Sequence, residues 1–138
     1  MVKIAVEYLG DLMCSVEHTP SGNKFLTDAP LDNKGQARYI SPTDTLCASL
    51  ASCIATIMGI RANENNVDIT GLKINAFKEM INEPFRRVGK ISFEIIFASE
   101  LSEKEFAIMK NVVKTCPVTR SLHPDIELEY DFKFNLGK

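Results

Sequence analysis

The sequence predicts an α+β fold, because segments that alternate like strands are interrupted by segments that carry the start and stop signals of helices. In chain order these segments read βββ-α-ββ-α-α-β. A length of 138 residues with 45% apolar side chains predicts a single domain, residues 1–138, with a buried core. The sequence contains no internal repeat and no low-complexity linker that would divide it.

Three short strands are expected ahead of the first helix. Residues 2–8 and 12–18 both alternate apolar with polar side chains, and Leu9-Gly10-Asp11 supplies the turn between them. A third strand is expected near residues 24–27, followed by an exposed loop up to residue 40. Cys14 falls on the apolar face of the second strand, which favours a packing role.

The central helix has the clearest signals. Ser41 and Asp44 form a capping box around Pro42, which suits the first helical position. Residues 45–60 then carry no charge, yet this stretch is short and rich in Ser and Thr for a membrane span. A helix that is apolar on every side needs cover on every side, and one small domain rarely supplies it. We therefore expect a homodimer and no membrane.

The second half of the chain predicts two strands, two helices and a final strand. The strands cover residues 72–80 and 90–97, and a helix over 102–115 begins with the capping box of Ser102 and Glu105. Pro117 opens a short helix that ends before Pro124. The last strand, from residue 126 to 136, alternates apolar and polar side chains throughout.

Composition excludes several functional classes. The formal charge is −2 and no Lys/Arg-rich run occurs, so a nucleic-acid partner is not expected. The N-terminus lacks the features of a secretory signal, which predicts a cytoplasmic location. The cysteines have no CxxC spacing, and His18 and His123 have no partner spacing, so no metal or other cofactor is expected.

Two cysteines are candidates for a chemical role. Cys53 lies inside the uncharged helix, where a cysteine most simply acts as a small apolar residue, and Cys47 has the same interpretation. Cys116 directly precedes Pro117, so it occupies a helix cap, where free N–H groups favour a thiolate. The residues alone leave both readings open.

Three stretches together resemble one known family. They are Ser41-Pro42-Thr43-Asp44-Thr45-Leu46, then Ala48-Ser49-Leu50-Ala51-Ser52-Cys53, and finally Cys116-Pro117-Val118-Thr119-Arg120-Ser121-Leu122-His123-Pro124. Their order and separation resemble the OsmC/Ohr family of thiol-dependent, peroxide-reducing proteins, and Asp44 matches its OsmC-like branch. The resemblance implies an OsmC-like fold, an intertwined homodimer with antiparallel sheets around central buried helices and thiol sites at the subunit interface.

The resemblance also implies roles for individual residues. Cys53 would attack an organic hydroperoxide and become a sulfenic acid, and Cys116 would resolve it as a Cys53–Cys116 disulfide. An external dithiol reductant would complete the cycle. The family activates its first cysteine with an arginine held by a carboxylate, for which Arg38 and Asp44 are the candidates, with Arg120 as an alternative. Asp44 is equally well explained as the capping-box residue alone.

Other functions stay open from the sequence. The main alternative is a non-catalytic or redox-sensing protein of the same fold that binds a small apolar ligand. A dimer whose cysteines only pack is a third reading, and a zinc site built from Cys and His is a fourth. The preferred peroxide and the physiological reductant do not follow from the sequence.

Overall fold

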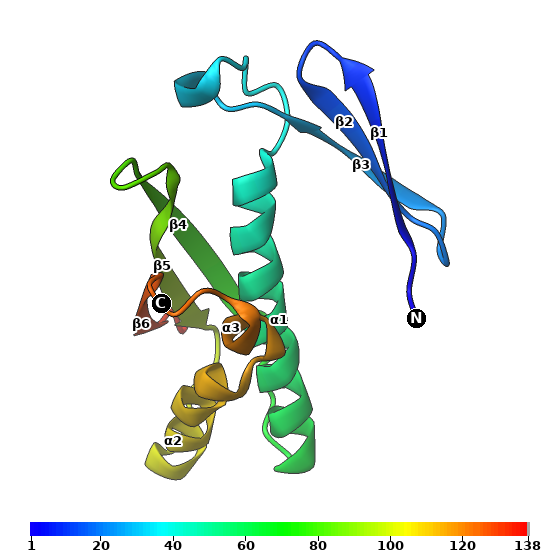
Figure 1. The fold of residues 1–138 in the computed structure, drawn as a ribbon. Coiled ribbons are helices and arrows are strands. Elements are labelled where there is room, and N and C mark those ends of the chain that lie inside the picture. Colours follow the sequence, from blue (N-terminus) through cyan, green and yellow to red (C-terminus); the bar gives the residue numbers. More distant parts are fainter. Residues whose placement is uncertain (138) are drawn as a thin grey trace. The chain divides into compact units, whose positions relative to one another are not determined.

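The structure of the protein, a computed structural model, describes residues 1–137 (Figure 1). Its elements follow the predicted order of strands and helices, so the α+β class is confirmed. Contacts within the chain define two compact units, Met1–Leu46 and a second unit that begins at Cys47.

The first unit is an antiparallel sheet in the order β1-β2-β3, formed by β1 (Ile4–Gly10), β2 (Met13–His18) and β3 (Asn23–Asp28). The turn from β1 to β2 lies at Asp11 and Leu12, which both have positive φ, slightly later than the sequence predicted. A short 3-10 helix, η1 (Leu31–Asn33), follows in the loop.

One face of this sheet is apolar and open. The register pairs Val6 with Val16, and Val16 in turn with Phe25, so these side chains share a face. In the single chain Val6 is 63% exposed, and its neighbour Tyr8 is 64% exposed. The alternation that the sequence predicted is present, but the chain itself does not cover the apolar side of β1.

The central helix α1 (Pro42–Glu64) begins as predicted. Ser41 Oγ accepts the Asp44 N–H at 3.0 Å, and Asp44 Oδ2 accepts the Ser41 N–H at 3.0 Å, which completes the capping box. The helix runs past the uncharged stretch to Glu64, where Arg61 Nη1 donates to the Glu64 carboxylate at 3.1 Å.

Only one stripe of α1 is buried in the single chain. Its members recur every three or four residues, as expected for one face of a helix: Cys47, Leu50, Ile54, Met58 and Ala62. By length and composition α1 also meets the requirements of a membrane-spanning helix, with a mean hydropathy of 1.5 over 18 residues. Core helices of soluble proteins meet the same requirements. The remaining sides of α1 are the ones for which the sequence predicts a second subunit.

The second unit contains a sheet in the order β4-β5-β6, formed by β4 (Lys73–Ile81), β5 (Arg87–Phe97) and β6 (Glu127–Phe134). Side chains of β5 alternate as predicted, with Ile91, Phe93, Ile95 and Phe97 buried. β4 and β5 are antiparallel, whereas β5 and β6 are parallel. This sheet is therefore mixed, because two helices carry the chain back between β5 and β6.

These helices are α2 (Glu103–Val112) and α3 (Pro117–Ser121), joined by the 3-10 turn η2 (Val113–Thr115). Ser102 and Glu105 form the predicted capping box of α2. The predicted helix over 102–115 stops being regular at Val113, since Cys116 must be extended ahead of Pro117 and has ψ of 123°. This break separates α2 from α3 and places Cys116 at the start of α3.

Candidate active site

The structure brings Cys53 and Cys116 together. Cys53 lies half-buried in the middle of α1, and Cys116 is fully buried at the start of α3, which Figure 1 shows beside α1. The Cys53 and Cys116 thiols share a hydrogen bond. Both are free thiols, so the pair is in its reduced form.

The local backbone conformation determines the position of Cys116 at the start of α3. Cys116 is the N-cap of α3, with extended backbone, and its carbonyl oxygen accepts the Arg120 N–H at 3.1 Å. Cap geometry turns the side chain toward the free N–H groups of the first turn. The Cys116 sulfur makes no regular cap hydrogen bond, but the N–H groups of Thr119 and Val118 lie near enough to lower the pKa of its thiol.

The two thiols differ in their tendency to ionise. Burial raises the pKa of Cys53, and the neighbouring Cys116 sulfur raises it further, while the Val118 N–H acts weakly in the other direction. Burial also opposes ionisation of Cys116, but the hydrogen bonds from Cys53, Thr119 and Val118 outweigh it, so the pKa of Cys116 is lowered.

Two further residues, which sequence reasoning missed, adjoin the pair. The Thr119 hydroxyl lies close enough to Cys116 to help lower the pKa of its thiol. Tyr130 reaches the same place from β6. Burial raises the pKa of the Tyr130 phenol, Thr119 lowers it, and the charge of Cys116 raises it. Of these two residues, Thr119 had a signal in the sequence, because the third residue after an N-cap is the usual hydrogen-bond partner of the cap. Tyr130 had no such signal.

Arg38 lies in a cluster of its own within the first unit. Its Nε donates to Asp28 Oδ2 at 2.8 Å, and its Nη1 donates to Asp11 Oδ2 at 2.9 Å. Nη2 adds bonds to Asp28 Oδ1 at 3.3 Å and to the Asp11 carbonyl at 3.0 Å. The carboxylates that hold Arg38 are thus those of Asp28 and Asp11, neither of which the sequence indicated.

Asp28 is the buried centre of that cluster, with 1% of its surface exposed. Its carboxylate also accepts the N–H groups of Ala29 at 2.8 Å and of Arg38 at 3.0 Å. The side-chain hydrogen bond from Arg38 is the main reason why the pKa of Asp28 falls from 3.8 to about 2, against the opposing effect of burial. The pKa of Arg38 is raised by the same contacts, first by Asp28 and then by Asp11.

The remaining candidates are placed as follows. Asp44 caps α1 through Ser41, which is the structural reading that the sequence left open. Arg120 is exposed in the last turn of α3. Cys47 is buried in the stripe of α1 and Cys14 is half-buried in β2, in keeping with packing roles. No group of three His, Cys, Asp or Glu side chains able to hold a metal ion occurs within residues 1–137.

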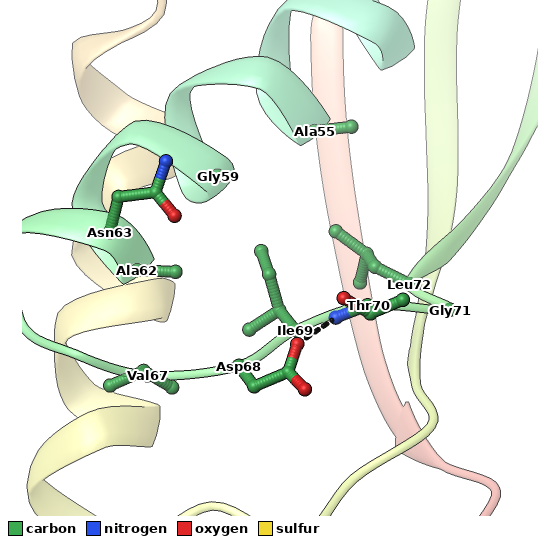
Figure 2. A pocket seen from close by; sticks show the side chains of 10 residues that line it. All are labelled: Ala55, Gly59, Ala62, Asn63, Val67, Asp68, Ile69, Thr70, Gly71 and Leu72. Carbon is green, nitrogen blue, oxygen red and sulfur yellow. Dashed lines mark hydrogen bonds between the residues drawn. The ribbon is translucent and has the colours of Figure 1, made fainter.

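A cavity of about 330 Å³ lies beside the C-terminal half of α1, and neither thiol lines it. Figure 2 shows small residues of the helix, Ala55, Gly59 and Ala62, facing the segment Val67–Leu72. Asp68, the acidic residue of the lining, accepts the Thr70 N–H at 2.9 Å and so serves the turn of that segment. The cavity therefore has space for a ligand but no reactive group of its own.

Comparisons with known proteins agree with this fold. The sequence model of the family described as OsmC-like protein matches residues 34–131. A crystal structure from Psychrobacter arcticus, of a protein assigned to osmotic stress and the detoxification response, is 43% identical over 96% of each chain, with a TM-score of 0.90. A comparison with curated proteins by sequence gives no match.

More distant structures share the fold. The OsmC-like protein of Mycoplasma pneumoniae is 17% identical, with a TM-score of 0.81 over 97% of this chain and 96% of the other. The organic hydroperoxide resistance protein OsmC of Legionella pneumophila is 12% identical, with a TM-score of 0.79 over 96% of each chain.

The fold and the paired thiols define an α+β protein with a dithiol site. With the family match over residues 34–131 and the 43% identical structure, the chain belongs to the OsmC-like family. The resemblance seen in the sequence is thereby confirmed, and two of the structures that share the fold are named organic hydroperoxide resistance proteins.

Proposed function

We propose that the protein is a thiol-dependent peroxidase that reduces organic hydroperoxides at Cys53 and Cys116. The observation that carries the proposal is the hydrogen bond between these two thiols, which belong to different elements and differ in exposure. A peroxide can meet the half-buried Cys53, whereas Cys116 is fully buried behind it. This arrangement suits Cys53 as the nucleophile and Cys116 as the resolving thiol.

The reaction has two covalent steps. The Cys53 thiolate attacks the outer peroxide oxygen, the O–O bond breaks, and the alkoxide leaves with a proton as an alcohol, which leaves Cys53 as a sulfenic acid. The Cys116 thiolate then attacks the Cys53 sulfur, and hydroxide leaves as water once it takes up a proton. One turnover oxidises both thiols to a disulfide, so an external dithiol must reduce that disulfide by exchange. These steps use no metal and no organic cofactor.

The homodimer is part of the same proposal. The apolar face of β1 is open in the single chain, with Ile4 55% and Val6 63% exposed, and only one stripe of α1 is buried. Covering such apolar surfaces lowers the free energy of the protein in water, and a second copy offers surfaces of the same kind. The cytoplasmic location stays a prediction of the sequence.

A second candidate function has one observation in its favour. The family's activating arginine must face the thiol, but Arg38 is already bound by Asp28 and Asp11, and the pKa of Cys53 is raised. A protein with this site could sense redox state or bind a small apolar ligand without rapid turnover.

Stopped-flow consumption of an alkyl hydroperoxide, with a dithiol in excess, separates the two candidates. A peroxidase should oxidise Cys53 much faster than the peroxide oxidises free cysteine at the same pH, and should turn over repeatedly. Cys47→Ser is the matched control, since it removes a buried thiol from the same helix. Wild-type oxidation no faster than that of free cysteine would favour the sensor.

A further inference from the structure

The cavity of about 330 Å³ beside the C-terminal half of α1 takes no part in the proposed reaction. Gly59, on its helix side, follows Cys53 by six residues, which corresponds to a rotation of about 240° around the helix. The cavity and the Cys53 thiol therefore lie on different sides of α1. A ligand in the cavity does not compete with a peroxide at the thiol.

Hydrogen bonds hold the walls of the cavity in place. The Val67 N–H donates to the Ala62 carbonyl oxygen at 2.8 Å, which ties the segment 67–72 to the end of the helix. Within that segment the Thr70 N–H donates to Asp68 Oδ1 at 2.9 Å (Figure 2). A cavity whose walls are already fixed binds a ligand at a lower cost in conformational entropy than a flexible loop does.

Small residues leave the helix side of the cavity unfilled. Ala62 is buried and Gly59 is half-buried, and Figure 2 shows Ile69 of the facing segment pointing toward the helix. A Cβ atom added at Gly59 would meet no atom from another part of the chain within 4 Å. The volume of about 330 Å³ is at the small end of the range for ligand sites. This side of the cavity therefore suits a small apolar group.

The charge of the lining is negative. Asp68 is the acidic residue among the ten that line the cavity, all within residues 1–137, and none of the ten is basic. The hydroxyl and N–H of Thr70 lower the pKa of Asp68, so its carboxylate is charged at neutral pH. Arg61, in the same part of α1, lines a different cavity and donates to the Glu64 carboxylate at 3.1 Å.

The helix adds to this negative potential. The cavity adjoins the last turns of α1, which ends at Glu64. The carbonyl end of a helix favours a positive charge nearby, as the Asp68 carboxylate also does. Both effects favour a cationic ligand over an anionic one.

We propose that this cavity binds a small amphiphilic cation, a compound with a short apolar chain or ring and an ammonium group. The ammonium group pairs with the Asp68 carboxylate, and the apolar part lies against Gly59, Ala62 and Ile69. Asp68 is exposed and Ala62 is buried, so the charged end of the ligand stays near water while the apolar end leaves it. The site is separate from the two thiols, and it does not depend on the proposed peroxidase function.

Probes of equal length test the chemistry of the ligand. Hexylammonium, hexanol and hexanoate share one apolar chain and differ in the charge of the head group. Titration of the nitrogen-15-labelled full chain, reduced and without peroxide, follows binding through the backbone amide signals of Gly59, Asp68 and Thr70 by NMR. We expect hexylammonium to shift these signals at the lowest concentration and hexanoate at the highest. Equal affinities, tighter binding of hexanoate, or no shift with hexylammonium would overturn the proposal.

A variant that fills the cavity tests the location of the ligand. Gly59→Leu places a side chain in the unfilled space and improves the helix propensity, so the protein should stay folded while hexylammonium binding is lost. Gly59→Ala is the matched control, because it adds a single methyl group at the same position and should still bind. Circular dichroism and thermal unfolding check the fold of both variants. Unchanged binding by Gly59→Leu would place the ligand elsewhere and refute the site.

Substitution of Asp68 removes the charge and keeps the shape. In Asp68→Asn the side-chain oxygen can still accept the Thr70 N–H, so the turn should remain. We expect the affinity for hexylammonium to fall about fivefold, the upper range for an exposed ion pair, and the affinity for hexanol to stay the same. Glu64→Gln is the matched control, since Glu64 ends the same helix without lining the cavity. No loss in Asp68→Asn, or an equal loss in both variants, contradicts the pairing with Asp68 and with it the proposal.

Discussion

The Cys53 and Cys116 thiols share a hydrogen bond across 63 positions of sequence and between two different helices. Because α3 begins at Pro117 and Cys116 is its N-cap, the first N–H groups of that short helix also lie near the same sulfur and lower the pKa of its thiol. The contact brings the two thiols within reach of each other. They differ in burial, because Cys53 is half-buried and Cys116 is fully buried.

Cys53→Ser should abolish peroxide turnover. A serine hydroxyl is far less acidic than a thiol and has no counterpart to the sulfenic acid, so the loss should reach the level of protein without enzyme. Peroxide consumption in the presence of a dithiol measures it, with Cys47→Ser as the control that retains activity. Catalytic turnover that survives in Cys53→Ser would assign the chemistry to another residue.

Cys116→Ser should allow one oxidation and then stop. Without the resolving thiol, Cys53 remains a sulfenic acid or is oxidised further, so mass spectrometry should find added oxygen where the wild type loses two hydrogens. Formation of an intramolecular disulfide in this variant would show that Cys14 or Cys47 can replace Cys116.

Stability should fall in acid as Asp28 becomes protonated. Its pKa is lowered from 3.8 to about 2, so its contribution to the free energy of unfolding is complete above pH 3.8 and is lost as the pH falls toward 2. Urea unfolding at fixed protein concentration, repeated through this range, should show a decline that Asp28→Asn lacks. If wild type and Asp28→Asn decline in parallel, another carboxylate is responsible.

Arg38→Lys tests the arginine that the family resemblance proposed. We expect it to slow Cys53 oxidation, because Lys keeps the charge but cannot reproduce the two-point contact of a guanidinium with a carboxylate, and we expect Asp44→Asn to have the same direction. The pH dependence of Cys53 alkylation measures the effect, with Arg120→Lys as the comparison. An unchanged pH profile in Arg38→Lys would mean that Arg38 does not activate Cys53 and serves only its structural contacts with Asp28 and Asp11.

Most of the fold could be predicted because its signals are local. The capping boxes of Ser41 with Asp44 and of Ser102 with Glu105 formed as predicted, and so did the alternation of β5. The parallel pairing of β6 with β5 was not predicted, since alternation gives the buried face of a strand and says nothing about its neighbour or its direction.

The site was predictable only in part for the same reason. Cys53 and Cys116 were found through a pattern that extends over the chain, whereas Asp28 was missed, because nothing in the sequence relates it to Arg38 ten residues later. Tyr130 was read as one more apolar residue of an alternating strand. Its position beside Thr119 depends on how β6 and α3 pack, which is a tertiary contact.

The open face of β1 makes the proposed dimer testable with two neighbouring residues. Val6 is opposite Val16, on the apolar face, and Glu7 is opposite Ser15, on the other. If a second copy covers Val6, which is 63% exposed in one chain, then Val6→Lys places a charge in an apolar interface. Loss of a buried valine alone is worth about 1.5–3 kcal/mol, so the dissociation constant should rise at least about tenfold.

Glu7→Lys introduces the same side chain on the opposite face of β1, so it should leave the dimer intact. Sedimentation equilibrium over a range of concentrations gives the dissociation constant of the wild type and of both variants. We expect wild type and Glu7→Lys to sediment as dimers where Val6→Lys yields monomers of 15.4 kDa. A wild type that is itself a monomer at micromolar concentration would end the dimer proposal. A dimer that tolerates Val6→Lys would instead show that the interface lies elsewhere, with the uncovered sides of α1 as the next surface to test.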